Sequence, residues 1–167
     1  MLFAETGGET MIKLSSLVSE GAIYLDLDVR SPSEALEEIA RRLVQAGVIQ
    51  EADRAGLHRV LLNREQICGT AVGRGAAIPH AYFAKLPQNM VVLARLRRPI
   101  DYASPDRKPV DLLFLLLGPQ RVAEDHLQIL GKIARLIKDE KFDRELRRAA
   151  TPAAALAALR ATEDRHR

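Results

Sequence analysis

The run Val110-Asp111-Leu112-Leu113-Phe114-Leu115-Leu116-Leu117 sets the architecture that we expect for this chain. Its apolar residues are nearly continuous and do not alternate with polar ones, which is typical of a β-strand buried on both faces. A second β-rich apolar run covers 90–96, and the segment 104–109, with two prolines, supplies the turn between them. Residues 23–29 alternate in polarity, which predicts a third, half-buried strand.

Helical patterns separate these strands. Ser31, Pro32 and Glu34 form a strong helix start, because serine caps, proline suits the first helical position and glutamate completes a capping box. Gly47 is expected to end this helix. Further helices are expected over 51–63, 123–138, 142–149 and 152–159, with inward stripes of Leu57, Val60 and Leu61 in the first and Leu127, Leu130, Ala134 and Ile137 in the second. This order predicts an α/β (α+β) fold, with a mixed parallel and antiparallel sheet flanked by helices on both faces.

The composition is that of an ordinary globular domain: 167 residues, of which 47% are apolar and 28% charged. We expect a flexible N-terminal extension at 1–11, one domain at 12–160 and a frayed, charged tail at 161–167, with Met11 as an alternative start. The single cysteine, Cys68, excludes an internal disulfide and fits a reducing compartment. No apolar run approaches the ~18 residues of a membrane helix, and the N-terminus lacks the features of a signal peptide. These features predict a cytoplasmic protein without direct membrane insertion.

The charge pattern argues against a nucleic-acid partner. The formal net charge is only +3, and residues of both signs are interspersed along the chain. With four Phe, three Tyr and no Trp, the chain has few rings on which bases could stack.

Two of the four histidines stand in positions that suggest chemistry. His58 in the middle of a helix and His166 in the tail are expected to be solvated surface residues. His80 follows a glycine-rich loop and a proline, and His126 lies in the first turn of a helix that begins just after the buried strand. Ligand sites gather at the C-terminal ends of strands and at helix N-termini.

Two imidazoles and an arginine suggest the handling of a phosphoryl group. A neutral imidazole has one unprotonated ring nitrogen that can attack phosphorus, a second ring can donate a hydrogen bond, and a guanidinium neutralises charge. Arg64 and Arg74 are the nearest candidates in sequence. The backbone N–H groups of the loop 69–75, which includes Gly73 and Gly75, can also face an anion.

One stretch carries a family resemblance. The sequence Arg64-Glu65-Gln66-Ile67, followed by Thr70-Ala71-Val72-Gly73-Arg74-Gly75-Ala76-Ala77-Ile78-Pro79-His80, resembles the active-site signature of the fructose/mannitol-type (type 2) enzyme IIA domains of the bacterial sugar phosphotransferase system. Segments 99–102, 108–117 and 126–130 resemble the same family in order, so the similarity covers about 13–159.

The resemblance implies a IIA-type phosphotransferase fold and a phosphocarrier with a phosphohistidine intermediate. His80 would accept phosphate from a phosphohistidine carrier protein of the HPr kind, Arg64 would stabilise the phosphoryl group, and His126 would hydrogen-bond it. The loop residues Thr70, Gly73, Arg74 and Gly75 would help to bind it. The family uses no metal and no organic cofactor.

Some positions leave alternatives open. Many relatives have Asn or His in place of Arg74, and we expect this side chain to point to solvent. Cys68 has no catalytic partner in its neighbourhood and is expected to be a small buried thiol. A carrier protein must dock over His80, and the nearby apolar residues are candidates for the contact patch: Ile78, Tyr82, Phe83 and Leu86. Core packing is the alternative for all four, and it is the one that we expect for Ile78.

Architecture favours regulation over transport. The chain has one IIA-like unit without a fused IIB or IIC, as in the nitrogen-regulatory branch of the family, where phosphorylation state controls another protein. A separate sugar-transport subunit that passes phosphate to a IIB partner is the first alternative. A module that binds partners without taking phosphate is the second. A transition-metal site of His80 and His126 with Glu124 or Asp125 is the third, and its spacing matches no strong metal motif.

Overall fold

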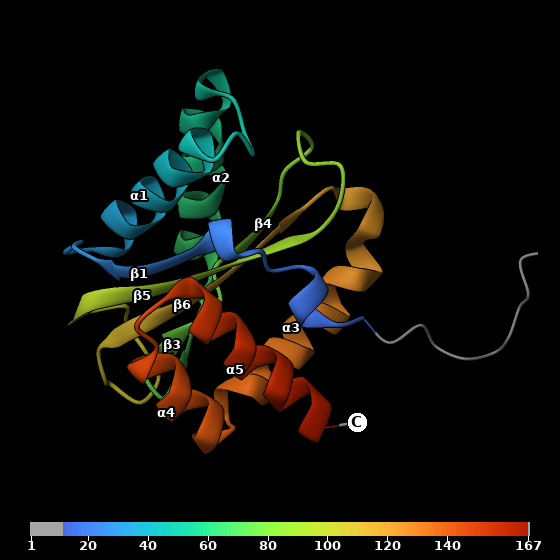
Figure 1. The fold of residues 1–167 in the computed structure, drawn as a ribbon. Coiled ribbons are helices and arrows are strands. Elements are labelled where there is room, and N and C mark those ends of the chain that lie inside the picture. Colours follow the sequence, from blue (N-terminus) through green and yellow to red (C-terminus); the bar gives the residue numbers. More distant parts are fainter. Residues whose placement is uncertain (1–11, 167) are drawn as a thin grey trace, which may run out of the picture.

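The computed structural model describes residues 12–166, so the extension expected at 1–11 and the alternative start at Met11 lie outside the described residues. The described part forms one sheet with helices on both faces (Figure 1). This arrangement confirms the predicted fold class.

The sheet is mixed. Its order is β1-β5-β6-β3-β2, and β4 also pairs with β6. The pairs β1–β5, β3–β6 and β4–β6 are parallel, whereas β5–β6 and β2–β3 are antiparallel. The strands are β1 (Ile23–Leu27), β2 (Ala71–Gly73), β3 (Ala76–Ala77), β4 (His80–Tyr82), β5 (Met90–Ile100) and β6 (Val110–Gly118).

Helices cover both faces of the sheet, with one group on each face (Figure 1). The first group is α1 (Pro32–Gln45) and α2 (Glu51–Ile67), and the second is α3 (Ala123–Ile137), α4 (Glu140–Arg148) and α5 (Pro152–Arg165). Three short 3₁₀ turns complete the described chain: η1 (Leu14–Ser16), η2 (Glu20–Ala22) and η3 (Gln120–Val122).

Strand β6 is the centre of the molecule, as its continuous apolar sequence predicts. Every residue of β6 except Asp111 is buried. Leu113, Leu115 and Leu117 belong to the core beneath α1 and α2, whereas Leu112, Phe114 and Leu116 belong to the core beneath α3, α4 and α5. A strand that contributes side chains to two cores needs apolar residues on both faces.

The signals for the start and end of α1 are confirmed. Ser31 Oγ accepts a hydrogen bond from the Glu34 backbone N–H at 3.1 Å, and Pro32 occupies the first helical position. The Glu34 carboxylate accepts from the Arg30 N–H at 2.9 Å, one residue before the cap. Gly47 adopts a φ of 75° just after the helix, a conformation that glycine tolerates without strain.

Other helix boundaries and faces were wrong. Helix α2 continues past 63 to Ile67, and α5 continues past 159 to Arg165, so residues 161–165 of the expected frayed tail form its last turn. Glu163 holds these turns in place, because its carboxylate accepts the backbone N–H groups of Leu14 and Ser15 at 2.7 and 2.8 Å.

The inward faces of two helices also differ from the prediction. Val60 of α2 is exposed, and only Leu57 and Leu61 of its stripe are buried. In α3 the expected stripe is correct except at its first residue: Ile137 is buried, and Leu130 and Ala134 pack partly buried against the core, but Leu127 is 74% exposed. The other buried residues of α3 are His126, Ile129, Ile133 and Leu136. The buried isoleucines pack with residues of β6 such as Phe114 and Leu116.

Candidate functional site

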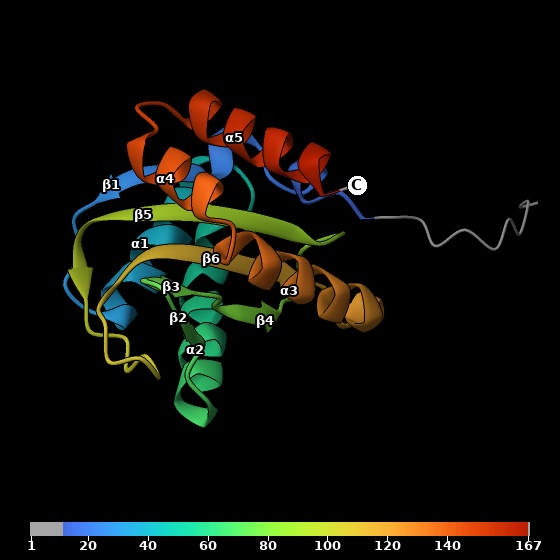
Figure 2. The same cartoon turned by 90° about the horizontal axis from the view of Figure 1, so that it is seen from below.

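The first residue of β4 is His80, and the backbone of β6 fixes its position. β4 pairs in parallel with the end of β6, with His80 opposite Leu116. The Leu116 N–H donates to the Pro79 carbonyl at 2.9 Å. Pro79 therefore takes part in the strand pairing as an acceptor, because proline has no N–H to donate. Figure 2 shows β4 beside β6, flanked by α2 and α3. The imidazole is half-buried at this edge.

Two hydrogen bonds define the protonation of the His80 ring. Nδ1 lies 2.8 Å from the Ile78 carbonyl oxygen, which can only accept, so Nδ1 carries the hydrogen. Nε2 lies 3.2 Å from Arg64 Nη2, which can only donate, so Nε2 is the unprotonated nitrogen. The neutral ring therefore turns its lone pair toward the guanidinium.

Arg64 reaches His80 because α2 extends to Ile67, beyond the end predicted at 63. The residue lies in the last turn of the helix, and its Nη1 donates to the Cys68 carbonyl at 2.9 Å. That carbonyl belongs to the residue that ends the helix, so the helix end itself holds the guanidinium. A positive group beside an unprotonated ring nitrogen is suited to stabilise an anionic group bound there.

His126 lies in the first turn of α3 and is buried at 4% exposure. Its ring packs against Tyr82, with centroids 4.7 Å apart. Burial lowers the pKa of His126, the nearby His80 lowers it further, and Asp125 opposes the shift. The second imidazole is therefore held in the neutral form, in which one ring nitrogen can still donate.

A cavity of about 480 Å³ joins the three residues. Arg64, His80 and His126 all line it, together with side chains from α2, β4 and α3. Five large apolar side chains are exposed in the described part of the chain, and four of them line this cavity: Val60, Ile67, Tyr82 and Leu127. Such a patch around a polar centre marks a protein contact site.

Comparison with known proteins identifies the family of this chain. Residues 16–161 match the family described as "Phosphoenolpyruvate-dependent sugar phosphotransferase system, EIIA 2". The chain belongs to this EIIA family. It is a phosphocarrier component of that system and a homologue of nitrogen regulatory proteins. The nitrogen regulatory protein of Bradyrhizobium diazoefficiens is 42% identical over 134 residues, which cover 80% of this chain and 86% of that protein.

Solved structures give the same fold. The nitrogen regulatory protein IIA-Ntr of Neisseria meningitidis matches with a TM-score of 0.78 and 29% identity, over 87% of this chain and 97% of that one. The mannitol enzyme IIA of Escherichia coli, solved in complex with phosphorylated enzyme IIB, matches with a TM-score of 0.69 and 16% identity, over 86% and 97%. At this low identity, the second match shows the fold alone.

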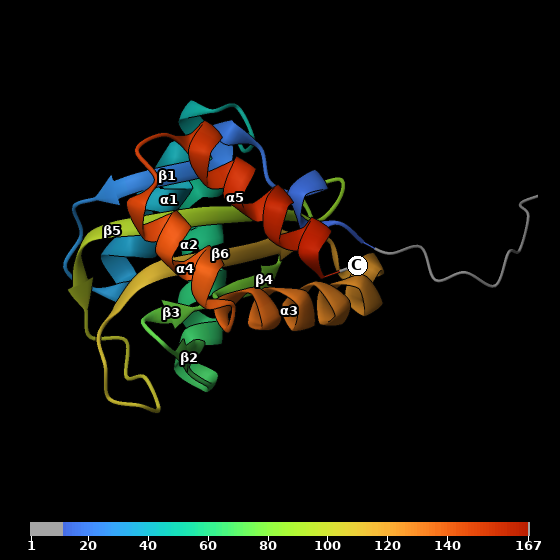
Figure 3. The ribbon, with the colours of Figure 1, turned by 60° about the horizontal axis from the view of Figure 1, so that its bottom comes forward.

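The glycine-rich turn of the EIIA domain lies away from His80, contrary to expectation. Gly73, Arg74 and Gly75 form the turn between β2 and β3, all with positive φ. β3 pairs with the first part of β6, opposite Leu112 and Leu113, and β4 with the last part; Figure 3 shows the two strands along different halves of β6.

The turn is occupied by structural contacts. The Arg74 N–H donates to Asp106 Oδ2 at 3.0 Å, and the Arg74 carbonyl accepts from Arg147. A Cβ on Gly75 would lie 2.9 Å from Arg147 Nη2 and 3.2 Å from Asp111 Oδ1. The glycines therefore make room for a charged cluster, and the Arg74 side chain is exposed, as expected.

Thr70 links the end of α2 to the segment before His80 by hydrogen bonds. Its N–H and hydroxyl both donate to the Glu65 carboxylate, at 2.8 and 2.6 Å, and its carbonyl accepts from Ile78. The hydroxyl is thus committed to the end of α2. The three-residue set Thr70, Glu65 and Ile78 ties the helix of Arg64 to the segment that presents His80.

Several other expectations need correction. Of the candidate contact patch, Leu86 is buried, Phe83 is partly buried, and only Tyr82 is exposed. Ile78 is buried, which confirms the core position expected for it. Cys68 is exposed, because it follows the last turn of α2 at the surface. His58 is half-buried, and its Nε2 lies 3.0 Å from the Ser33 carbonyl, which links α2 to α1.

The sequence did not reveal Val60, Ile67 and Leu127 as surface groups. Their periodicity suits a core as well as a contact patch, so only the neighbouring elements distinguish the two. The described residues contain no group of three His, Cys, Asp or Glu side chains placed to hold a metal ion. Within the same residues, no helix has the length and apolar character needed to cross a membrane.

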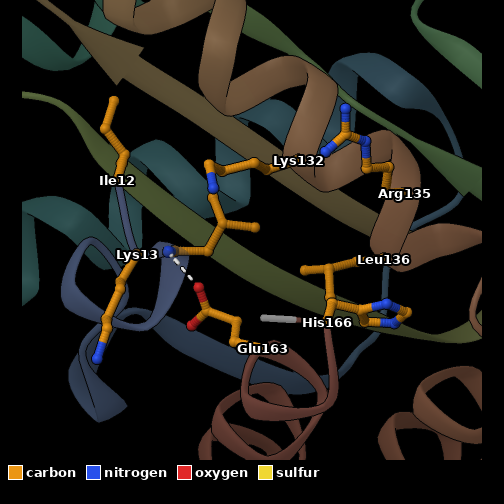
Figure 4. A pocket seen from close by; sticks show the side chains of 8 residues that line it. Ile12, Lys13, Lys132, Arg135, Leu136, Glu163 and His166 are labelled. Atoms are coloured by element: carbon orange, nitrogen blue, oxygen red, sulfur yellow. Dashed lines mark hydrogen bonds between the residues drawn. The ribbon is translucent and has the colours of Figure 1, made fainter. Parts of the chain in front are cut away.

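A cavity of about 530 Å³ lies elsewhere, between η1, α3 and the end of α5 (Figure 4). Its carboxylate, Glu163, is occupied by the backbone of Leu14 and Ser15. Its imidazole, His166, is exposed and lies 2.8 Å from Asp139. The carboxylate and the imidazole of this cavity thus serve the fold, whereas the smaller cavity brings Arg64, His80 and His126 together, so the smaller cavity is the candidate site.

Proposed function

We propose that Nε2 of His80 accepts a phosphoryl group from a phosphohistidine carrier protein of the HPr kind, and that the phosphorylation state of the domain regulates another protein. The observation that carries the proposal is the orientation of the His80 ring. Its hydrogen is fixed on Nδ1 by the Ile78 carbonyl, so the nucleophilic lone pair of Nε2 faces the cavity beside Arg64.

The transfer is an in-line exchange between two imidazoles. The His80 Nε2–phosphorus bond forms as the nitrogen–phosphorus bond of the donor breaks, and the bonding electrons return to the donor ring nitrogen. The His80 ring becomes more positive, and the Ile78 carbonyl, already bonded to Nδ1–H, stabilises that charge. Arg64 exchanges its contact with Nε2 for one with a phosphoryl oxygen.

Little further machinery is needed. Donor and product are both phosphoramidates, so the transfer is nearly isoenergetic and depends on positioning. His126 supplies a hydrogen bond to the phosphoryl group from the other side of the cavity. Docking of the carrier uses the four exposed apolar residues around the cavity, which would exclude water from the reacting atoms.

The choice of regulation over transport rests on similarity. The 42% identical relative over most of this chain is a nitrogen regulatory protein. The alternative is transfer from His80 to a IIB subunit, and its support is the fold shared with the mannitol enzyme IIA that was solved with phosphorylated IIB.

The test is a labelling experiment. The protein is incubated with phosphorylated HPr-type carrier, and an acid-labile, base-stable adduct is sought by mass spectrometry. We expect label on His80 and none on His80→Ala, whereas His166→Ala, at an exposed position outside the cavity, keeps it. A carrier that turns over without labelling the protein would show that the domain is a non-phosphorylated interaction module. Discharge of the labelled protein by an added IIB domain would favour transport.

A further inference from the structure

Two buried polar atoms without a hydrogen-bond partner lie beside Gly118, and one of them belongs to the His126 ring. Among the described side chains, Nε2 of His126 and Oδ1 of Asn89 are both buried and unpaired. A Cβ placed on Gly118 would lie 3.0 Å from the first atom and 1.9 Å from the second. An unpaired buried polar atom is costly, so two of them beside one glycine call for a physical reason.

The sheet register brings these groups together. Met90, the first residue of β5, pairs with Leu117, so Asn89 stands opposite Gly118, the last residue of β6. Because Gly118 has no side chain, the Asn89 amide can enter the space next to the His126 ring. The two polar atoms are at most about 5 Å apart, so the Asn89 amide is a close neighbour of the buried ring nitrogen.

The site of the hydrogen on His126 then matters. Nε2 is buried beside Gly118, which leaves Nδ1 as the nitrogen that can donate to a phosphoryl group on His80. A neutral imidazole has one hydrogen, so a donor at Nδ1 requires that Nε2 accept a hydrogen bond from elsewhere. A carboxamide can supply it through its NH₂ group, and its two ends are interchangeable by rotation.

We propose that Asn89 is a positioning residue: its side-chain amide donates to Nε2 of His126 and keeps the ring hydrogen on Nδ1, which faces the phosphoryl site. This role rests on the phosphoryl transfer to His80 proposed above. Gly118 is part of the same device, because any side chain at residue 118 would collide with the amide.

The first test reads the His126 ring directly and needs no phosphate. In ¹⁵N NMR spectra of the ring nitrogens, we expect the Nδ1–H form in the wild type and the Nε2–H form in Asn89→Asp, because a carboxylate only accepts. The charged and titratable groups around the ring are His80 and Tyr82 from β4, Asp125 from α3 and, beyond His80, Arg64 from α2. The new carboxylate should raise the pKa of His126 by about one unit or more.

The second test measures transfer. Asn89→Leu keeps a side chain branched at Cγ and removes the hydrogen bond, so we expect the rate of phosphoryl transfer to His80 to fall about tenfold. Gly118→Ala should give a similar fall. Gln88→Leu removes an exposed amide next door and should transfer like the wild type. In a His126→Ala background, Asn89→Leu should cause no further fall in the rate of phosphoryl transfer, because the amide acts only through the His126 ring.

The outcomes separate this role from the proposed function. A wild-type protein that takes no phosphate from the carrier overturns the proposed function, and the NMR result still decides the ring tautomer. A wild type that is phosphorylated, with the same His126 tautomer in wild type and Asn89→Asp, overturns the role of Asn89 alone. Additive losses in the double variant also overturn it, since they would show that Asn89 acts independently of His126.

Discussion

Arg64 and His80 form a direct contact in which Nη2 of the arginine lies 3.2 Å from Nε2 of the histidine. The other terminal nitrogen of Arg64, Nη1, donates to the Cys68 carbonyl at 2.9 Å. The guanidinium is thereby anchored at one end and free to exchange acceptors at the other. An incoming phosphoryl group can replace Nε2 as acceptor without a movement of the helix.

Removal of the Arg64 guanidinium should slow transfer while the fold stays intact. We expect Arg64→Ala to reduce the rate of phosphoryl transfer from the carrier by about 100-fold, as for loss of one donor to a developing anion. The transfer rate of Arg64→Lys should lie between those of the wild type and Arg64→Ala, because lysine keeps the charge but lacks the planar guanidinium that binds two acceptors. Arg59→Ala, exposed on the same helix, is the control for rapid-quench kinetics. Equal rates for Arg64→Ala and Arg59→Ala would rule out this role.

The exposed apolar residues around the cavity should matter for docking and not for the intrinsic reactivity of His80. Leu127→Glu should raise the KM for the phosphorylated carrier at least about tenfold, as expected for a central contact residue. Phosphorylation by a small donor such as phosphoramidate should be nearly unchanged. Val72→Glu, at the exposed apolar residue outside the cavity, should leave both reactions intact. If Leu127→Glu slows the small donor equally, the patch is not a docking surface.

The turn of Gly75 should affect stability and leave phosphate acceptance unchanged. Its φ is +74°, so Gly75→Ala should lower the free energy of unfolding by about 1–2 kcal/mol, with further loss from contact with Arg147. Gly56→Ala, inside α2 with open space around it, should raise the free energy of unfolding by about 0.5–1 kcal/mol. Urea denaturation compares the two variants. A loss of phosphorylation in folded Gly75→Ala would instead place this turn in the binding site.

His126 should make stability depend on pH. Burial and His80 lower its pKa in the folded protein, whereas the unfolded chain has a value near 6.5. Between the two values the unfolded state binds more protons, so the free energy of unfolding should decrease as the pH falls from about 7 through 6.5 toward the folded pKa. His126→Gln should flatten this part of the profile, measured by urea denaturation at several pH values. Parallel profiles for the two proteins would contradict a neutral, buried His126.

Local sequence was sufficient where one residue type has a strong conformational preference. The continuous apolar run of β6, the Ser31 cap and the positive-φ Gly47 each predicted their structure correctly, because the physical cause lies within a few residues. The position of His80 was predicted only in part: it was expected at the end of a strand that stops at Pro79, whereas it begins β4 beside the last part of β6.

Tertiary packing decided what periodicity left open. In α3, Leu127 and Leu130 lie on one helical face and Ile129 and Ile133 on an overlapping one, so the sequence alone does not say which face meets β6. The structure buries the isoleucines and thereby leaves Leu127 beside the cavity.

The sequence therefore determined the fold class, the central strand and the pair of histidines, because these depend on hydrophobic pattern and local backbone preference. Only the tertiary structure decided that the glycine turn lies away from His80, that Arg64 bonds to Nε2, and that Asn89 and His126 both border the space at Gly118. These relationships join segments far apart in the chain, and they depend on strand register and helix length, which no short stretch of sequence encodes.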